Sequence, residues 1–514
     1  MSSCGSASCL GGALMQIVAT GLADAVLTGN PNITFWRIQT KAYTNFALEV
    51  NIQDFNAGVP HFGQCPKINI DRVGDLVYFL YVIADLPGIG LPFPNPQTTP
   101  NAESYSILSN YDVSMNTPVE PYWTQDVGHA LIDKAVVYIG GQCIDEIHSE
   151  FLYLWEELSG QPGKRLVEMT GNYQSVSALM IASRQPRKLY IPLPFWFTLN
   201  SGNALPLVSL QFHSFQVAIA LKHYLKLLKL TYTAMNTYGY TLNQIEERPY
   251  FNPSNAKDVQ PVSALSKLTN ASLNAQMLIT YIYLDQRERS QFADGQFETL
   301  INQHQRQDTS VQHSVSGENQ YAGQYVTTQL ELTFNHPVFE IYWVGRLGIH
   351  EDFNSISIPE YNEWFNFRGP LDTVTKLPID IFQESQLKLN NSNRWPWIEC
   401  RYFRLVEPYQ FHTNICDVNM IYSYSFSLQP EDVQPAGSCN FSRIDNAVQY
   451  WKIDKRVFVG PARAGGPDVD CDQGYGAGCG TNPSVNSSLT IMIFVQNYNI
   501  MRFKYGLGGL RFAA

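Results

Sequence analysis

One cluster of carboxylates in this chain has a spacing that could bind a metal ion. Asp468, Asp470 and Asp472 alternate along a glycine-rich segment, and hard oxygen ligands at alternate positions begin a calcium-binding loop. The match then fails, because Gln473 and Cys479 stand where such a loop needs glycine and glutamate. We therefore expect a solvated acidic loop, with calcium binding as the weaker alternative, and we assign no metal or cofactor.

Other residues that could do chemistry lack the neighbours that catalysis needs. The ten histidines are scattered and form no HExxH pair. Adjacent acids could in principle serve a glycosidase, but neighbours in sequence do not by themselves converge on a substrate. No GxSxG nucleophile motif is present. We expect structural roles, and no catalytic residue, for the histidines beside strand ends (His129, His213, His336, His412) and for the acid pairs Glu156–Glu157 and Asp145–Glu146.

Cysteines and sequons give no further site. Nine cysteines at irregular spacing reveal no disulfide framework, so we expect mostly reduced thiols and a cytosolic place of synthesis, with a Cys471–Cys479 bridge left open. Without a basic segment before the first apolar stretch, a secretory signal is not expected, so glycosylation is given little weight. The sequons are at Asn32, Asn270, Asn390, Asn440 and Asn486.

The elements that must position these residues are β-strands. Tyr422, Tyr424, Phe426 and Leu428 alternate with serines, which is the period-2 pattern of a half-buried strand. Gly140-Gly141 between two apolar runs predicts a tight hairpin. A helix is expected at Glu150–Leu158, and further strands at Phe46–Gln53, Leu76–Ile83, Leu189–Phe197, Leu210–Leu221, Met277–Leu284, Leu330–Phe334, Val338–Val344, Leu387–Leu389 and Leu489–Val495.

Long irregular connections separate the strands. Seven prolines between Leu86 and Pro121 exclude a central strand or helix there, so a long surface loop is expected. Gln291–Gln324 is polar and is expected to hold one helix, while Gly345–Asp380 and Asp454–Pro483 are expected to be loops. Two sets of about eight strands with a few very long loops are what a pair of jelly rolls requires.

Length and composition agree with an all-β chain that makes large contacts. At 514 residues two β domains fit, and we predict an N-terminal arm over 1–27, a first jelly roll over 28–225 and a second over 226–514. Charged residues are only 15% of the chain, which indicates surface covered by partners. The net charge of -11 repels polyphosphate, so direct nucleic-acid binding is not expected.

The N-terminal arm has an apolar stretch from Leu10 to Leu27 that Asp24 interrupts. At this length, and rich in small residues, it is marginal for a membrane span. Its apolar residues fall near helical spacing, which predicts a short amphipathic arm, with an ordered tail lying on the barrel as an equal alternative.

Many ordered motifs resemble the major capsid protein family of nucleocytoplasmic large DNA viruses. They span nearly the whole chain, whereas the three long loops match no family pattern. The motifs are Gly11–Ala19, Leu27–Phe35, Tyr43–Phe46, Ile139–Asp145, Ala204–Leu207, Leu210–His213, Tyr283–Arg289, Asn335–Pro337, Gln434–Pro435, Cys439–Ala447, Asn497–Asn499 and Gly506–Leu510.

The resemblance implies a double jelly roll that forms a homotrimer. Six barrels would then make a pseudo-hexameric capsomer that tiles an icosahedral shell and contacts neighbouring capsomers. It also implies that the N-terminal arm lies beneath the capsomer, towards minor capsid proteins and an internal membrane, in a virion assembled in the host cytoplasm. The rival readings are a jelly-roll carbohydrate-binding protein or glycosidase and a minor capsid component.

Overall fold

The computed structural model describes residues 19–31, 42–56, 58–89, 121–173, 175–183, 185–230, 273–313, 324–351, 362–370, 377–458 and 488–512, together with Met15 and Phe35. The chain divides into two compact units, 1–46 and 47–514. In the first unit, helix α2 (Leu22–Thr28) begins where the Asp24 carboxylate accepts a hydrogen bond from the Gly21 N–H at 2.9 Å. Its apolar side chains are all exposed, and the rest of the expected amphipathic pattern lies outside the described residues.

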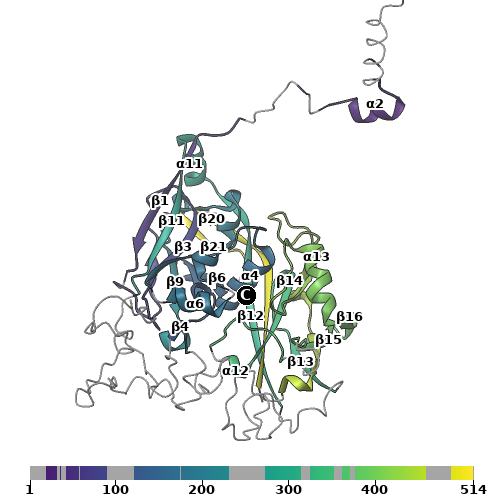
Figure 1. Cartoon of the computed structure of the whole chain (residues 1–514). Coiled ribbons are helices and arrows are strands. Elements are labelled where there is room, and N and C mark those ends of the chain that lie inside the picture. Colours follow the sequence, from purple (N-terminus) through teal and green to yellow (C-terminus); the bar gives the residue numbers. More distant parts are fainter. Residues whose placement is uncertain are drawn as a thin grey trace, which may run out of the picture. The chain divides into compact units, whose positions relative to one another are not determined.

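Two antiparallel sheets form the first roll (Figure 1). One sheet has the order β1-β11-β3-β7, and the other has the order β2-β9-β5-β6. The core lies between them and is filled by aliphatic and aromatic side chains of β2, β3, β5, β6, β7, β9 and β11. The strands are β1 (Phe46–Asp54), β2 (Lys67–Asn69), β3 (Leu76–Leu86), β5 (Ile132–Ile139), β6 (Gln142–His148), β7 (Arg187–Pro192), β9 (Phe215–Leu221) and β11 (Gln276–Leu284).

A second pair of sheets follows, with orders β12-β20-β14-β17 and β13-β19-β15-β16. Counted from the first main strand of each roll, both rolls have the sheet orders 1-8-3-6 and 2-7-4-5, the topology of a jelly roll. The strands are β12 (Phe297–Gln312), β13 (Tyr325–Glu331), β14 (Pro337–Leu347), β15 (Phe382–Leu389), β16 (Ser392–Glu399), β17 (Tyr422–Ser425), β19 (Ala447–Asp454) and β20 (Ser488–Lys504).

Shorter elements complete the body. Three short strands pair with strands of the main sheets, two more form a separate two-stranded sheet, and helices fill the connections. The strands are β4 (Pro121–Trp123), β8 (Leu205–Pro206), β10 (Leu228–Leu230), β18 (Cys439–Asn440) and β21 (Leu507–Leu510); the helices are α3 (Val127–Leu131), α4 (Ser149–Ser159), α5 (Val167–Thr170), α6 (Val176–Ser183), α7 (Trp196–Leu199), α11 (Gln286–Asp294), α12 (Gly348–Glu351), η4 (Tyr402–Val406) and α13 (Glu407–Phe411), with 3-10 turns at Ser201–Asn203, Leu207–Ser209, Tyr224–Lys226, Phe441–Arg443 and Lys455–Phe458.

The expected double jelly roll is confirmed, as are the hairpin and one helix. Gly140 and Gly141 join β5 to β6 with φ of 58° and 83°, which glycine adopts without strain. Helix α4 occupies the segment expected for it.

Three expectations about strands are wrong. The strand Met277–Leu284 pairs with β3 and so belongs to the first roll, not the second. The segment Gln291–Gln324 holds the end of α11 but also the 16-residue strand β12, whose middle contacts polar groups of the other roll, as where the His304 N–H binds Asp145. Strand β7 ends at Pro192, and α7 replaces the rest of the expected strand Leu189–Phe197.

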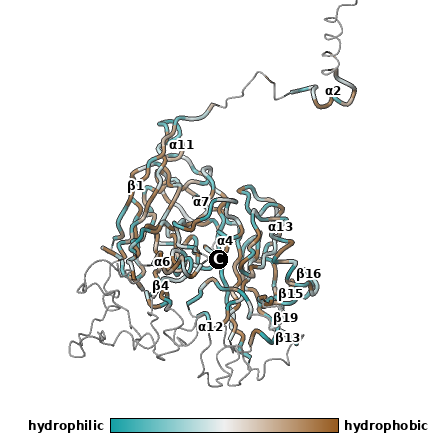
Figure 2. Tube along the Cα trace, in the orientation of Figure 1, coloured by the Kyte–Doolittle hydropathy of each residue, from teal (hydrophilic) through white to brown (hydrophobic). Residues whose placement is uncertain are grey.

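Strand β20 connects the two cores. Met492 and Phe494 point into the core of the first roll, while residues that alternate with them, such as Ile491 and Ile493, point into the core of the second. The sheet of β12, β20 and β14 is therefore covered on both faces, which explains its continuous apolar sequence in β20. Figure 2 shows hydrophobic residues along the strands of both rolls.

Candidate functional site: the junction between the two rolls

Helix α4 carries aromatic and charged contacts between the rolls. It follows β6 of the first roll and places Phe151 against the second roll, with ring centroids 5.9 Å from Tyr342 and 6.1 Å from Phe494. Further along the helix, Tyr153 stacks on Phe365 at 4.7 Å with the rings 8° from parallel. These aromatic contacts bury one face of α4 between the two sheets and give the junction an apolar base.

A buried carboxylate at the start of α4 binds two arginines of the second roll. Glu150 is 4% exposed. Its two carboxylate oxygens accept hydrogen bonds from Arg306 and Arg346, each at 2.9 Å. Burial alone would raise the pKa of Glu150, but the charges of Arg346, Lys222 and Arg306 hold it well below its usual range. Glu150 is therefore ionised and links α4 to β12 and β14 at once.

Lys222 adds a buried cation to the same cluster. Its ammonium donates a hydrogen bond to the Ser149 hydroxyl at 3.1 Å and lies 4.4 Å from the centre of the Trp364 ring. Burial lowers the pKa of Lys222 to about 8, although Glu150 opposes this shift. The indole of Trp364 in turn donates a hydrogen bond to the Lys226 carbonyl at 2.7 Å. Trp364 therefore binds the second roll to the segment after β9.

Two further polar contacts align the rolls. The Asp145 carboxylate of β6 accepts a hydrogen bond from the His304 backbone N–H at 2.8 Å, and its other oxygen lies 2.9 Å from His304 Nδ1. The Asn362 amide donates to the carbonyls of Leu225 and Leu228, both at 2.8 Å. Because these bonds have fixed directions, the junction holds one relative orientation of the two rolls.

The acid pairs considered for catalysis are engaged in structural contacts. Asp145 serves the junction, and Glu146 lies 3.1 Å from both Lys134 and His148. Glu157 lies 3.5 Å from the Cys416 thiol. The carboxyl groups of Asp145 and Glu146 thus point to different partners, and Glu156 lines a pocket while Glu157 faces Cys416.

The four histidines also lie at separate places. His129 is buried 2.7 Å from Asp126, and His213 Nδ1 lies 2.9 Å from the Gly508 carbonyl. His336 has a φ of 68°, and burial lowers its pKa. His412 is buried between two carboxylates, 2.7 Å from Glu340 and 3.0 Å from Glu431. No two of these four histidines share a site.

Burial tends to lower the pKa of His412, but the two carboxylates outweigh this effect and raise it to about 10. The imidazolium is therefore protonated at neutral pH and neutralises two acids inside the second roll. Among the described residues no group of histidine, cysteine and acidic side chains could hold a metal ion. The candidate calcium ligands Asp468, Asp470 and Asp472, and the Cys471–Cys479 pair, lie outside the described residues.

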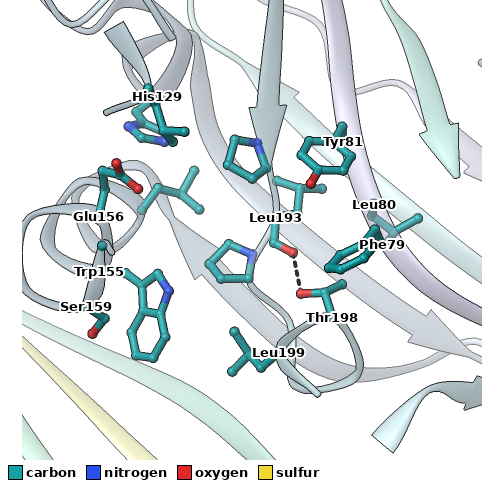
Figure 3. Close-up of a pocket in the computed structure, with 15 residues that line it drawn as sticks. Phe79, Leu80, Tyr81, His129, Trp155, Glu156, Ser159, Leu193, Thr198 and Leu199 are labelled. Atoms are coloured by element: carbon teal, nitrogen blue, oxygen red, sulfur yellow. Dashed lines mark hydrogen bonds between the residues drawn. The ribbon is translucent and has the colours of Figure 1, made fainter. Parts of the chain in front are cut away.

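A pocket of about 250 Å³ lies between α4, the middle of β3 and the loop after β7 (Figure 3). Trp155 and Leu199 form part of its apolar wall, and Thr198 donates to the Leu193 carbonyl at 3.0 Å. Burial raises the pKa of Glu156, at one side of the pocket, to about 7. No described helix is long and apolar enough to cross a membrane.

Most residues of the junction carry no signal in the sequence that marks them as partners. Glu150 begins an expected helix, and Arg306 and Trp364 lie in segments expected to be irregular. The one available signal is Arg346, a charge that follows a continuous apolar run and is 4% exposed in the structure. Such a charge needs a buried partner, although the sequence does not say which.

Comparison with known proteins identifies the family. Residues 34–285 match the family described as major capsid protein N-terminus, and residues 288–509 match the large eukaryotic DNA virus major capsid protein. The major capsid protein of Pyramimonas orientalis virus is 30% identical, over 98% of this chain and 100% of that protein. That of Paramecium bursaria Chlorella virus 1 is 27% identical, with the same coverage.

Solved structures show the same fold. A subunit of the PBCV-1 virus capsid is similar with a TM-score of 0.63 and 23% identity, over 94% of this chain and 100% of that chain. The Faustovirus major capsid protein is similar with a TM-score of 0.59 and 10% identity, over 95% of both chains. This chain belongs to the major capsid protein family of large eukaryotic DNA viruses, and it is a structural subunit of the virion capsid.

Proposed function

We propose that three copies of this chain form a pseudo-hexameric capsomer. The observation that carries the proposal is the pair of rolls with identical strand order, fixed to each other by the buried contacts of Glu150, Arg306 and Arg346. Two like bodies per chain, repeated by a threefold axis, place six similar bodies around a ring. Six bodies give a nearly hexagonal outline, which tiles a shell with neighbouring capsomers.

The junction matters because tiling needs a rigid subunit. If the two rolls could rotate about their connection, the outline would vary and neighbouring capsomers would not meet edge to edge. Paired and stacked groups such as Asp145 with His304 and Tyr153 with Phe365 oppose that rotation. In this proposal the chain acts by assembly and has no catalytic step or cofactor.

We also propose the limits of the rolls and the remaining partners. The pairing of β11 with β3 favours a boundary after Leu284 instead of the expected one at residue 225. The N-terminal arm, which holds the apolar side chains of α2, would face minor capsid proteins and an internal membrane. The net charge of -11 argues against direct contact with the genome. Synthesis and assembly in the host cytoplasm fit the thiols that are free in the structure, including buried Cys400 and Cys416.

The oligomer can be tested with purified protein. We expect light scattering after gel filtration to give three times the subunit mass, and negative-stain averages to show six-lobed particles. A stable monomer at high concentration, or a trimer whose averages show three lobes, would contradict the proposal. No observation in the structure favours the carbohydrate-binding alternative over this one.

A further inference from the structure

Strand β1 presents its apolar side chains away from the core of its own roll. Leu48, Val50 and Ile52 are 57%, 58% and 52% exposed. The alternating polar residues face inward, as shown by Gln53, whose side chain accepts a hydrogen bond at 3.3 Å from the hydroxyl of the buried Tyr281. A shift of one residue in pairing would reverse the two faces, so this register leaves an apolar row uncovered.

The apolar row continues onto the neighbouring strands of the same sheet. Because Met277 and Ile279 point into the core, Leu278 between them points outward, and it pairs with the outward Tyr81 of β3. On β7, Tyr190 is outward and 38% exposed. Together these side chains form what we call the sheet face: Leu48, Val50, Ile52, Leu278, Tyr81 and Tyr190. Leu278 and Tyr81 are half-buried, and the other four side chains are exposed. Exposed apolar side chains gathered on one sheet mark an interaction site.

The polar groups at the rim of the sheet face are already paired within the chain. Asp85 lies 3.6 Å from Lys188 and accepts a hydrogen bond from Asn274 at 2.5 Å. Asp54 accepts one from Gln276 at 2.8 Å. An apolar centre with a compensated polar rim suits a protein partner. The described part of this rim carries no cluster of unpaired lysines and arginines, the feature that attracts an anionic membrane or a nucleic acid.

A second apolar surface lies on the opposite flank of the body, on the helix formed by η4 and α13 (Figure 1). Phe403 and Glu407 of this helix are buried. Leu405 and Val406 are each 39% exposed and Tyr409 is 76% exposed. We call these three outward residues the helix flank.

We propose that the sheet face of one copy of this chain packs on the helix flank of the next copy. The inference rests on the proposed trimer and names the surfaces that build it. A ring of identical copies needs two different surfaces that complement each other, since a surface that pairs with itself closes a dimer. The sheet face and the helix flank are both apolar and lie on different flanks of the body, so one copy can contact two neighbours at the same time, as every copy in a head-to-tail ring must.

Two variants test the pairing. Val50→Lys with Ile52→Lys places two charges on the sheet face, and Leu405→Lys with Tyr409→Lys does the same on the helix flank. All four side chains are exposed, so both variants are expected to fold, as checked by circular dichroism. We expect each variant alone to be monomeric, with a subunit dissociation constant raised roughly 100-fold or more, because charges would be buried without partners.

Mixing the two variants gives the decisive result. Each keeps one intact surface, so the mixture should form a heterodimer with one copy of each variant, and nothing larger, in mass photometry. A sheet face that paired with itself would leave the helix-flank variant fully assembled, which would overturn the proposal. Val176→Lys on α6, a 54% exposed site away from both surfaces, is the matched control and should assemble normally.

Other outcomes separate this inference from the trimer itself. A monomeric wild-type protein would contradict the proposed function. A wild-type trimer that both double variants still form would contradict only the assignment of surfaces. Normal assembly of the sheet-face variant with loss of binding to phosphatidylcholine–phosphatidylserine vesicles would show that this face meets a membrane, and would also overturn the proposal.

Discussion

Replacing Glu150 by glutamine should uncouple the two rolls. The change keeps the size of the side chain but removes the charge that Arg306 and Arg346 share. One glutamine oxygen can still accept a hydrogen bond, while the amide group would point donors at an arginine that is itself a donor. Arg346 is 4% exposed, so its charge would remain buried with one partner fewer.

The expected cost follows from how the arginines are otherwise paired. Removing one member of a buried ion pair typically costs about 3–5 kcal/mol. Arg346 keeps a bond to Glu351 at 2.6 Å, and Arg306 keeps one to Asp308 at 2.7 Å, so we expect the lower end, about 3 kcal/mol. That loss lowers the ratio of folded to unfolded protein more than 100-fold.

Urea unfolding followed by tryptophan fluorescence measures this change, because Trp364 lies in the junction and is 8% exposed. Protein concentration must be constant, since assembly adds concentration-dependent stability. Glu168→Gln, at an exposed position of α5, is the control and should change the free energy of unfolding by less than about 0.5 kcal/mol. A similarly small change for Glu150→Gln would refute the reasoning that this carboxylate holds the rolls together.

Three buried ionisable groups predict how stability depends on pH. Burial lowers the pKa of Lys222 to about 8, so between pH 8 and 10.5 the unfolded chain binds more protons than the folded one. The stability of the wild type, measured by urea titration relative to Lys222→Met, should therefore rise by about 3 kcal/mol across that window. The carboxylates around His412 raise its pKa to about 10 against the effect of burial, so its contribution to folding stability is complete below pH 6.5 and is lost as pH rises through 10. His412→Gln should therefore cost about 3 kcal/mol of stability at pH 6. A neutral imidazole at pH 8, observed by NMR, would contradict this. Burial raises the pKa of Glu156 to about 7, so wild-type stability should fall as pH rises from 4.5 through 7. The fall should be roughly 1–2 kcal/mol, because the group is partly solvated. Melting curves of Glu156→Gln should not show this dependence on pH.

Local patterns in the sequence were enough to find the paired runs of strands and the hairpin at Gly140-Gly141. Alternation and turn residues involve only a few neighbouring positions, so strands and turns can be recognised from them without knowledge of the fold. The motifs that resemble the capsid family were also readable, and their order along the chain implied two jelly rolls. The same patterns could not assign Met277–Leu284 to the first roll, because its partner β3 is about 200 residues earlier.

Period-2 alternation shows that a strand has an apolar face but not which way that face points. For β1 the alternation predicts a strand, but only its place in the folded sheet shows that its apolar side chains are exposed. The polar strand β12 carries no apolar alternation, and its polar groups have partners in both rolls. Arg306 binds Glu150 of the first roll, and Gln305 donates to the Asn335 carbonyl of the second.

The sequence alone determined the class of fold, the likeness to the capsid family and the net negative charge. The tertiary structure alone decided the ion pairs of Glu150, the direction of the apolar row on β1 and the pairing of Met277–Leu284 with β3. The physical reason is range: strand propensity and turn chemistry depend on neighbours in the chain, whereas buried charges and sheet faces depend on partners brought together by folding.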